Sequence, residues 1–234
     1  MNSQNGTSCV VYSIPRAGTH AVMNVMRVIG LKEFTPKNGI GIYNINTMPS
    51  KGHFEYGGHF TPDMEPIAAM RLRGYRGVFI SRDLRDVVVS HAHMGIVDAK
   101  KQGKHPLYPV FNMGNLNKAI SWLMEYEVHR YLVRIGWRMI PGVYSTTYER
   151  LWLQTKTEIA NMATHLGIQL TDEQINKCVI DFAPTNKENP YKFYYRQGSV
   201  GDWKNYFTEE HKKEFKKIAG HILIKEGYEK DMEW

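Results

Sequence analysis

The spacing of apolar residues divides the first part of the chain into a strand, a turn and a helix. Residues 8–14, SCVVYSI, form a short apolar run that is typical of a buried parallel strand. Apolar residues then recur with helical spacing from Val22 to Ile29, and Gly30 can end that helix in the left-handed conformation. We therefore predict a strand that leads directly into a helix over residues 8–30.

Further along the chain, apolar runs with strand character alternate with segments of helical period. The predicted strands cover residues 75–82 and 138–145, and the predicted helices cover 116–136, 156–168 and 208–228, with another helix beginning at Asp83. Thr208 is the expected N-cap of the last helix, and Glu209 and Glu210 favour its first turn. This alternation predicts an α/β fold with a central parallel β-sheet flanked by helices.

Two segments rich in glycine, proline and polar residues, 31–66 and 91–115, are predicted to be long loops. With 234 residues, of which 42% are hydrophobic, the chain is expected to form a single domain over residues 1–234. No apolar run approaches the ~18 residues that cross a membrane, and residues 1–8 lack the apolar core of a signal peptide. With only two cysteines, these features predict a cytoplasmic protein with no membrane partner.

A net charge of +7 indicates an anionic partner, such as a nucleotide, a sulfate or a nucleic acid. The stretch Pro-Arg-Ala-Gly-Thr-His at residues 15–20 suits such an anion. Gly18 lets the backbone approach it, Arg16 and Thr19 add donors, and the amides of the helix N-terminus point towards it. The stretch is not a Walker A loop. Since turns with one glycine often join a strand to a helix, a purely structural turn stays open.

Two later stretches repeat this combination. In SRDLRDVVVSHA, Arg82 follows a predicted strand and Ser90 comes two helical turns later, at the sheet edge where α/β proteins bind ligands. Arg85 and Asp86 are expected to make local ion pairs instead.

The third stretch is YYRQGSVGDWKNYF, in which Arg196 stands near Gly198. Glycine beside arginine again suits close approach to a phosphate. The alternative is a surface loop, and Trp203 is expected to pack the following helix onto the core in either case.

The order and spacing of the three stretches resemble those of the sulfotransferases that use 3′-phosphoadenosine-5′-phosphosulfate (PAPS). The family's Pro-Lys/Arg-Ser-Gly-Thr loop is matched at residues 15–19, and its Arg-x-x-x-Asp-x-x-x-Ser element by Arg82, Asp86 and Ser90. Its most specific motif, Arg-Lys-Gly-x-x-Gly-Asp-Trp-Lys-Asn, is matched at residues 196–205. The resemblance runs from about residue 9 to 228 and implies the P-loop-kinase-like sulfotransferase fold. In size the chain looks like the compact bacterial members.

The resemblance implies a set of residues that bind PAPS and its product, 3′,5′-adenosine bisphosphate (PAP). The first loop would hold the 5′-phosphosulfate, the later arginines and Ser90 the 3′-phosphate, and an aromatic residue the adenine. The implied residues are Arg16, Ala17, Gly18, Thr19, His20, Arg82, Ser90, Tyr148, Arg196, Gln197 and Gly198. No metal is implied.

The resemblance also implies a histidine that acts as general base, and the stretch GGHFTP offers His59. The unperturbed pKa of imidazole, about 6.5, predicts a rate that rises between roughly pH 6 and 7. His53, in KGHFE, is a rival for this role. Arg16 would be the second catalytic residue, stabilising charge without donating a proton, because its pKa exceeds about 12.

Several positions depart from the family pattern. Arg16 replaces the usual lysine, Ala17 a serine and Gln197 a lysine. Ala21 replaces the tryptophan that stacks on the adenine, so another aromatic residue would have to do so. A dimerisation element often seen near the third motif is incomplete, which leaves the oligomeric state open.

The implied reaction transfers a sulfonate group from PAPS to a hydroxyl or amine of a small-molecule acceptor, without a nucleic-acid partner. The acceptor pocket is expected to be formed by residues 34–66 and 91–125. Natural products, including guanidinium alkaloids, are candidate acceptors. Two other functions stay open: a P-loop nucleotide or adenylylsulfate kinase, and a non-enzymatic basic domain that binds nucleic acid.

Overall fold

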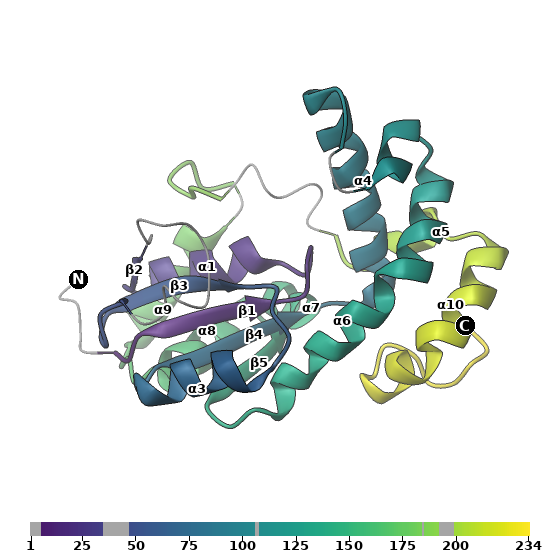
Figure 1. The fold of residues 1–234 in the computed structure, drawn as a ribbon. Helices are drawn as coiled ribbons and strands as arrows, with labels where there is room; N and C mark the ends of the chain where they lie inside the picture. Colours follow the sequence, from purple (N-terminus) through teal and green to yellow (C-terminus); the bar gives the residue numbers. More distant parts are fainter. Residues whose placement is uncertain (1–5, 35–46, 106–107, 184, 192–198) are drawn as a thin grey trace. The chain divides into compact units, whose positions relative to one another are not determined.

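The computed structural model describes residues 6–34, 47–105, 108–183, 185–191 and 199–234. These residues form two compact units (Figure 1). The first unit takes its described residues from 1–81 and 134–198, and the second from 82–133 and 199–234. The prediction of a single sulfotransferase domain over residues 1–234 stays a prediction.

The first unit contains the predicted parallel sheet, with five strands in the order β2-β3-β1-β4-β5. The strands are β1 Cys9–Ser13, β2 Lys32–Glu33, β3 His53–Gly58, β4 Arg76–Ser81 and β5 Val143–Thr147. Every residue of β1 is buried, as expected for a central strand with covered faces. The segments that follow β1 and β3 leave the sheet at the same edge, because the two strands are parallel neighbours.

Helices cover both faces of this sheet (Figure 1). One face packs against α1 Thr19–Val28, α7 Tyr148–Leu153, α8 Thr155–His165 and α9 Asp172–Phe182, which share one apolar core with β1. The other face carries α3 Met64–Leu72 and the short helix η2 Ile135–Met139, whose Trp137 ring stacks on Tyr12 with centroids 3.8 Å apart. The α/β fold class with a flanked parallel sheet is therefore confirmed.

The second unit is helical. Its elements are α4 Leu84–Gln102, η1 Pro109–Met113, α5 Leu116–Tyr126, α6 Val128–Arg134, η4 Asp202–Asn205 and α10 Glu209–Lys225, with Arg134 itself assigned to the first unit. Thr208 caps α10 as predicted, with its hydroxyl accepting from the backbone N–H of His211 at 3.2 Å. Among the described residues, no helix combines the length and apolar character needed to cross a membrane.

The prediction of one loop over residues 31–66 is wrong, because β3 lies within it. The two glycines of HFEYGG lower its strand propensity. Packing demands one of them, since a Cβ at Gly57 would lie 2.4 Å from Cγ1 of Val10 on the neighbouring strand. Glycine at position 57 is therefore explained by a close approach across the sheet, which the sequence does not reveal.

Three predicted boundaries also differ. The helix expected over 116–136 is divided at Glu127, whose φ of −114° ends α5 and whose carbonyl then starts α6. The strand expected at 138–145 begins only at Val143, because residues 135–139 form η2. Helix α4 runs on to Gln102, through the first part of the expected loop, and Gly95 within it leaves room for the ring of Phe111.

Candidate active site

A sharp turn joins β1 to α1 at one edge of the sheet. Gly18 is the N-cap of α1 with φ 103°, and as a glycine it brings no side chain to cap this helix end. Arg16, with φ 65°, is the one non-glycine residue of the described chain with a positive φ. The uncapped amides at the start of α1 form an end of the kind that binds anions, with the helix dipole adding to their attraction.

Gly18 is also required by the packing of Tyr148. A Cβ at position 18 would lie 2.7 Å from Cδ2 of this tyrosine, which begins α7 and is buried. The ring of Tyr148 thus lies directly against the turn. Its predicted contact with an adenine stays a prediction.

A chain of side-chain contacts leads from the turn to His59, which follows β3. The hydroxyl of Ser13 lies 2.7 Å from that of Thr19 and 3.1 Å from Nδ1 of His59. The same Nδ1 lies 3.0 Å from the carbonyl oxygen of Ser13. Because a carbonyl only accepts, Nδ1 carries the proton of the neutral ring and Nε2 keeps its lone pair.

Burial lowers the pKa of His59 to about 4, well below the range expected from the sequence. The backbone hydrogen bond to Ser13 raises this pKa, whereas the charges of Arg134, Arg16 and His20 lower it. Burial, and secondarily Arg16, lower the pKa of His20 to about 4 as well. His59 is therefore neutral at pH 7, which is the state that a general base requires.

Residues distant in the sequence hold His59 in place. Arg134 donates from Nε to the carbonyl oxygen of His59, and Trp137 donates from Nε1 to that of Phe60 at 2.9 Å. The ring of Tyr56 meets His59 edge to face, with centroids 5.4 Å apart. No local sequence signal points to Arg134 or Trp137, because both act on residues more than 70 positions away.

His53, the rival base, lies at the other end of β3. Its Nδ1 contacts the carbonyl oxygen of Lys51 at 2.8 Å. At about 3.3 Å per strand residue, it stands roughly 20 Å from His59. Of the two histidines, His59 is the one beside the turn.

In the second unit, Asp86 joins two of the predicted motifs. This buried carboxylate accepts hydrogen bonds from Nη2 of Arg82 at 3.2 Å and from the backbone amides of Gly201 and Trp203 at 2.9 and 2.8 Å. Arg82 also donates to the carbonyl oxygen of Ser199 at 2.9 Å. Burial raises the pKa of Asp86, and its three donors oppose that shift. The expectation of a merely local ion pair misses the contacts with 201–203.

Arg85 follows a different pattern from Arg82. It pairs with Asp83 at 2.7 Å, as predicted, and also with Glu229 at 2.5 Å. Its guanidinium lies over the rings of Trp203 and Trp234, 3.9 and 4.4 Å from their centroids. These contacts are structural, because Arg85 is only 2% exposed and is committed to them.

Of the remaining predicted residues, some are buried in the described structure and others lie outside it. Ser90 is buried on α4, two turns after Arg82, and Ala17 is buried in the turn before α1. Arg196, Gln197 and Gly198 lie outside the described residues. Within the described ranges, no group of three or more His, Cys, Asp or Glu residues is arranged to hold a metal ion.

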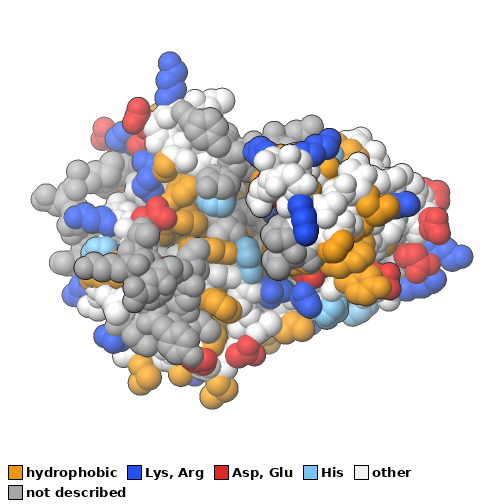
Figure 2. All heavy atoms as spheres, turned by 45° about the horizontal axis from the view of Figure 1, so that its top comes forward, with side chains coloured by type: hydrophobic (Ala, Val, Ile, Leu, Met, Phe, Trp, Pro, Cys, Tyr) orange, Lys and Arg blue, Asp and Glu red, His pale blue; other side chains and the backbone are white. Residues whose placement is uncertain are grey.

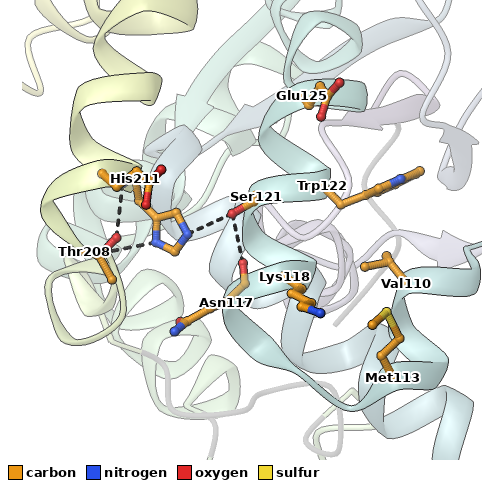
Figure 3. Close-up of a pocket in the computed structure, with 10 residues that line it drawn as sticks. Val110, Met113, Asn117, Lys118, Ser121, Trp122, Glu125, Thr208 and His211 are labelled. Atoms are coloured by element: carbon orange, nitrogen blue, oxygen red, sulfur yellow. Dashed lines mark hydrogen bonds between the residues drawn. The ribbon is translucent and has the colours of Figure 1, made fainter.

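The second unit also carries an open pocket of about 420 Å³, bounded by η1, α5 and the start of α10 (Figure 3). Val110, Met113 and Trp122 give it an apolar side, and the hydroxyl of Ser121 contacts Nε2 of His211 at 3.0 Å on the other. Its residues 110–125 belong to the segment predicted to bind the acceptor. The α10 residues that complete it were not expected.

Comparison of the sequence with known families and proteins gives one consistent result. The family model described as Sulfotransferase domain matches residues 10–227. Sulfotransferase 6B1 of Danio rerio is 25% identical over 186 residues, which cover 71% of this chain and 60% of that protein. A flavonol sulfotransferase-like protein of Flaveria bidentis is 25% identical over 180 residues, covering 65% and 55%. The chain thus spans little more than half the length of these curated relatives.

Solved structures show the same fold at lower identity. Mouse sulfotransferase SULT7A1, complexed with PAP, superposes with a TM-score of 0.72 at 19% identity and covers 93% of this chain and 84% of its own. Retinol dehydratase, in complex with androsterone and PAP, superposes with a TM-score of 0.65 at 18% identity. The superposition covers 92% of this chain and 80% of retinol dehydratase. The P-loop-kinase-like sulfotransferase fold is confirmed by these likenesses. Because the family model matches residues 10–227, the chain belongs to the sulfotransferase domain family.

Proposed function

We propose that this chain transfers the sulfonate group of PAPS to a hydroxyl or amine of a small-molecule acceptor. One observation carries the proposal: a neutral histidine, its Nδ1 bound to a carbonyl, stands beside an uncapped helix N-terminus. The first feature suits a general base and the second an anionic donor. Membership of the sulfotransferase family supports the same chemistry.

The donor would be bound through both of its phosphate groups. The amides of Gly18, Thr19 and His20 and the guanidinium of Arg16 would hold the 5′-phosphosulfate, and Tyr148 would contact the adenine. The amide of Ala17, also predicted to bind it, donates to the carbonyl oxygen of Ile14 at 3.1 Å. Arg82 and Ser90 would bind the 3′-phosphate, with Arg196, Gln197 and Gly198 contributing from the third motif. Asp86 supports this assignment, because it fixes the orientation of Arg82 and ties it to the segment 199–203.

In the reaction, the acceptor oxygen or nitrogen forms a bond to sulfur as the bond from sulfur to the bridging oxygen breaks. PAP departs with that electron pair, and Nε2 of His59 takes the proton of the acceptor. Negative charge that builds up on the bridging oxygen would be stabilised by Arg16 and by the amides at the start of α1. Arg16 does so as a fixed charge and transfers no proton.

Radiolabelled PAPS, incubated with the protein and a panel of phenols, alcohols and amines, tests the proposal. We expect labelled product and an equal amount of PAP. His59→Ala should abolish turnover while PAP still binds, and His53→Ala, the matched control, should stay active. Phosphoryl transfer from ATP would favour a kinase instead, and strongly salt-dependent binding of long polyanions without turnover would favour a nucleic-acid-binding protein.

A further inference from the structure

Ser13 occupies a position that the motifs do not mark. It is the last residue of β1 and is 1% exposed. Its hydroxyl lies between the hydroxyl of Thr19, at 2.7 Å, and Nδ1 of His59, at 3.1 Å. One buried oxygen thus contacts both the first helical residue of the anion-binding turn and the proposed base.

The carbonyl of Ser13 fixes the direction of the hydrogen bond from His59. Because Nδ1 of His59 faces this acceptor at 3.0 Å, Nδ1 holds the proton. Its N–H is then shared between the carbonyl and the hydroxyl oxygen of Ser13. Between Ser13 and Thr19 either hydroxyl can be the donor, and the Ser13 hydroxyl also bonds the side chain of Tyr56. An anion at the turn that accepts the Thr19 proton would leave Ser13 to donate to Thr19. Hydrogen bonds aligned in this way polarise one another.

We propose that Ser13 is a positioning residue that couples occupancy of the turn at the start of α1 to the orientation of His59. The proposal rests on the proposed function. A sulfonate donor that accepts the hydrogen bond from Thr19 makes the Ser13 hydroxyl the donor to Thr19, which strengthens the bond from Nδ1 of His59 to Ser13. The Nε2 lone pair is therefore held towards the acceptor best when the donor is present.

A first test needs no turnover. We expect ¹⁵N NMR of the His59 ring in the full chain to show the Nδ1–H tautomer, and its signals to shift when PAP is added. That shift should persist in Ser13→Thr, which keeps the hydroxyl, and be lost in Ser13→Ala. An Nε2–H tautomer in the wild-type protein, or the same PAP-induced shift in Ser13→Ala, would overturn the proposal.

The second test measures turnover. Ser13→Ala should lower kcat about tenfold and leave the KM of the acceptor within about twofold, whereas Ser13→Thr should recover most of kcat. Ser145→Ala is the matched control, because it removes from β5 of the same sheet a buried hydroxyl that has no hydrogen-bond partner in the described part of the chain. Thermal melts of all three variants report any loss of folding.

A kcat in Ser13→Ala equal to that of wild type would contradict the coupling, as would a loss that Ser13→Thr fails to recover in a folded protein. Failure of the proposed function has a different signature. Wild-type protein would then neither bind PAP nor transfer sulfonate, although the His59 tautomer could still be read.

Discussion

His59 shows how strongly one environment changes a residue's chemistry. The sequence suggests a base that titrates between pH 6 and 7, whereas burial lowers its pKa to about 4. We therefore expect kcat/KM to be nearly flat from pH 5.5 to 8 and to fall only as the pH approaches 4, where Nε2 takes up a proton. The pKa of His59 is lower in the folded chain than in the unfolded chain, so the unfolded chain takes up the proton first as the pH falls. The free energy of unfolding therefore decreases as the pH falls from about 6.5 to 4.

A pH profile of kcat/KM, with circular dichroism at each point to confirm that the protein is folded, checks this expectation. If the profile shows an inflection between pH 6 and 7 that disappears when a different histidine is replaced, that histidine causes it and the expectation for His59 stands. If the inflection persists when each of the other histidines is replaced, His59 itself titrates there, and its ring is far better solvated than its burial indicates.

Arg16 combines charge with backbone strain. A non-glycine residue at φ 65° costs on the order of 1 kcal/mol relative to glycine. Arg16→Ala and Arg16→Gly should both lower kcat about a hundredfold, the scale for losing one key donor, and Arg16→Lys should keep substantial activity. Arg16→Gly should unfold at a higher urea concentration than Arg16→Ala. Equal stabilities of the two would show that the left-handed conformation carries no strain.

Glu55 is a buried acid on β3 with neither carboxylate oxygen hydrogen-bonded within the described chain. Burial raises its pKa to about 7. The folded chain therefore holds a proton that the unfolded chain releases near its ordinary pKa, about 4.5. Stability falls as the pH rises from about 4.5 to 7 and is then lower by about 3 kcal/mol at most.

Glu55→Gln should remove this penalty, so that urea unfolding shows a clear gain at pH 8 and little change at pH 5. Glu158 provides the contrast, since it is also buried but is bonded by Thr146 at 2.7 Å and Arg150 at 2.5 Å. Glu158→Gln should destabilise the protein at both pH values. A loss of stability in Glu55→Gln at pH 8 would mean that its carboxylate is satisfied after all.

At the scale of elements, Asp86 links the first turn of α4 to the segment before η4. Both of its oxygens are used, one by Arg82 and Gly201 and the other by Trp203. Asp86→Asn keeps only one accepting oxygen and loses the charge that orients Arg82. We expect PAP to bind about tenfold more weakly and AMP, which lacks the 3′-phosphate, to change less than twofold.

Calorimetry with both nucleotides measures this difference, and Asp98→Asn, on the same helix, is the control. Equal weakening of PAP and AMP would indicate a general loss of structure. Unchanged PAP binding would show that the orientation of Arg82 does not depend on Asp86.

Elements whose own residues dictate their structure could be predicted from the sequence. The β-branched run of β1 and the N-cap Thr208 of α10 are examples, because burial and capping leave direct local signals. Strand β3 was not predicted, since its two glycines weaken the local signal and the close approach of Val10 that explains Gly57 appears only in the folded sheet. The division between α5 and α6 at Glu127 was equally hidden, as neither glycine nor proline marks it.

The candidate site was predictable to the extent that its chemistry lies in contiguous motifs. The turn before α1 and the Arg82 element follow from spacing and resemblance. Ser13, Arg134 and Trp137 could not be identified in this way, because they contact His59 or its neighbour Phe60 from other parts of the chain. Motifs name the groups that touch a ligand, and the groups that orient them become visible only once the chain is folded.

Charge over the whole molecule bears on the acceptor. On the face in Figure 2, Lys and Arg side chains are scattered, some beside Asp and Glu side chains and some apart from them. The whole chain carries a net charge of +7. Near His59, the positive charges of Arg16 and Arg134 both lower the pKa of the ring.

An acceptor that reaches Nε2 of His59 must approach these two positive charges. A guanidinium or ammonium group close to the reacting hydroxyl is repelled, whereas a neutral phenol is not. Guanidinium alkaloids are therefore the less favoured of the proposed acceptors. In a matched pair such as 4-ethylphenol and tyramine, we expect kcat/KM to favour the neutral phenol about tenfold at low salt. The ratio should shrink at 0.5 M salt, where screening weakens the repulsion. A preference for the cation at low salt would show that carboxylates elsewhere in the acceptor site outweigh Arg16 and Arg134.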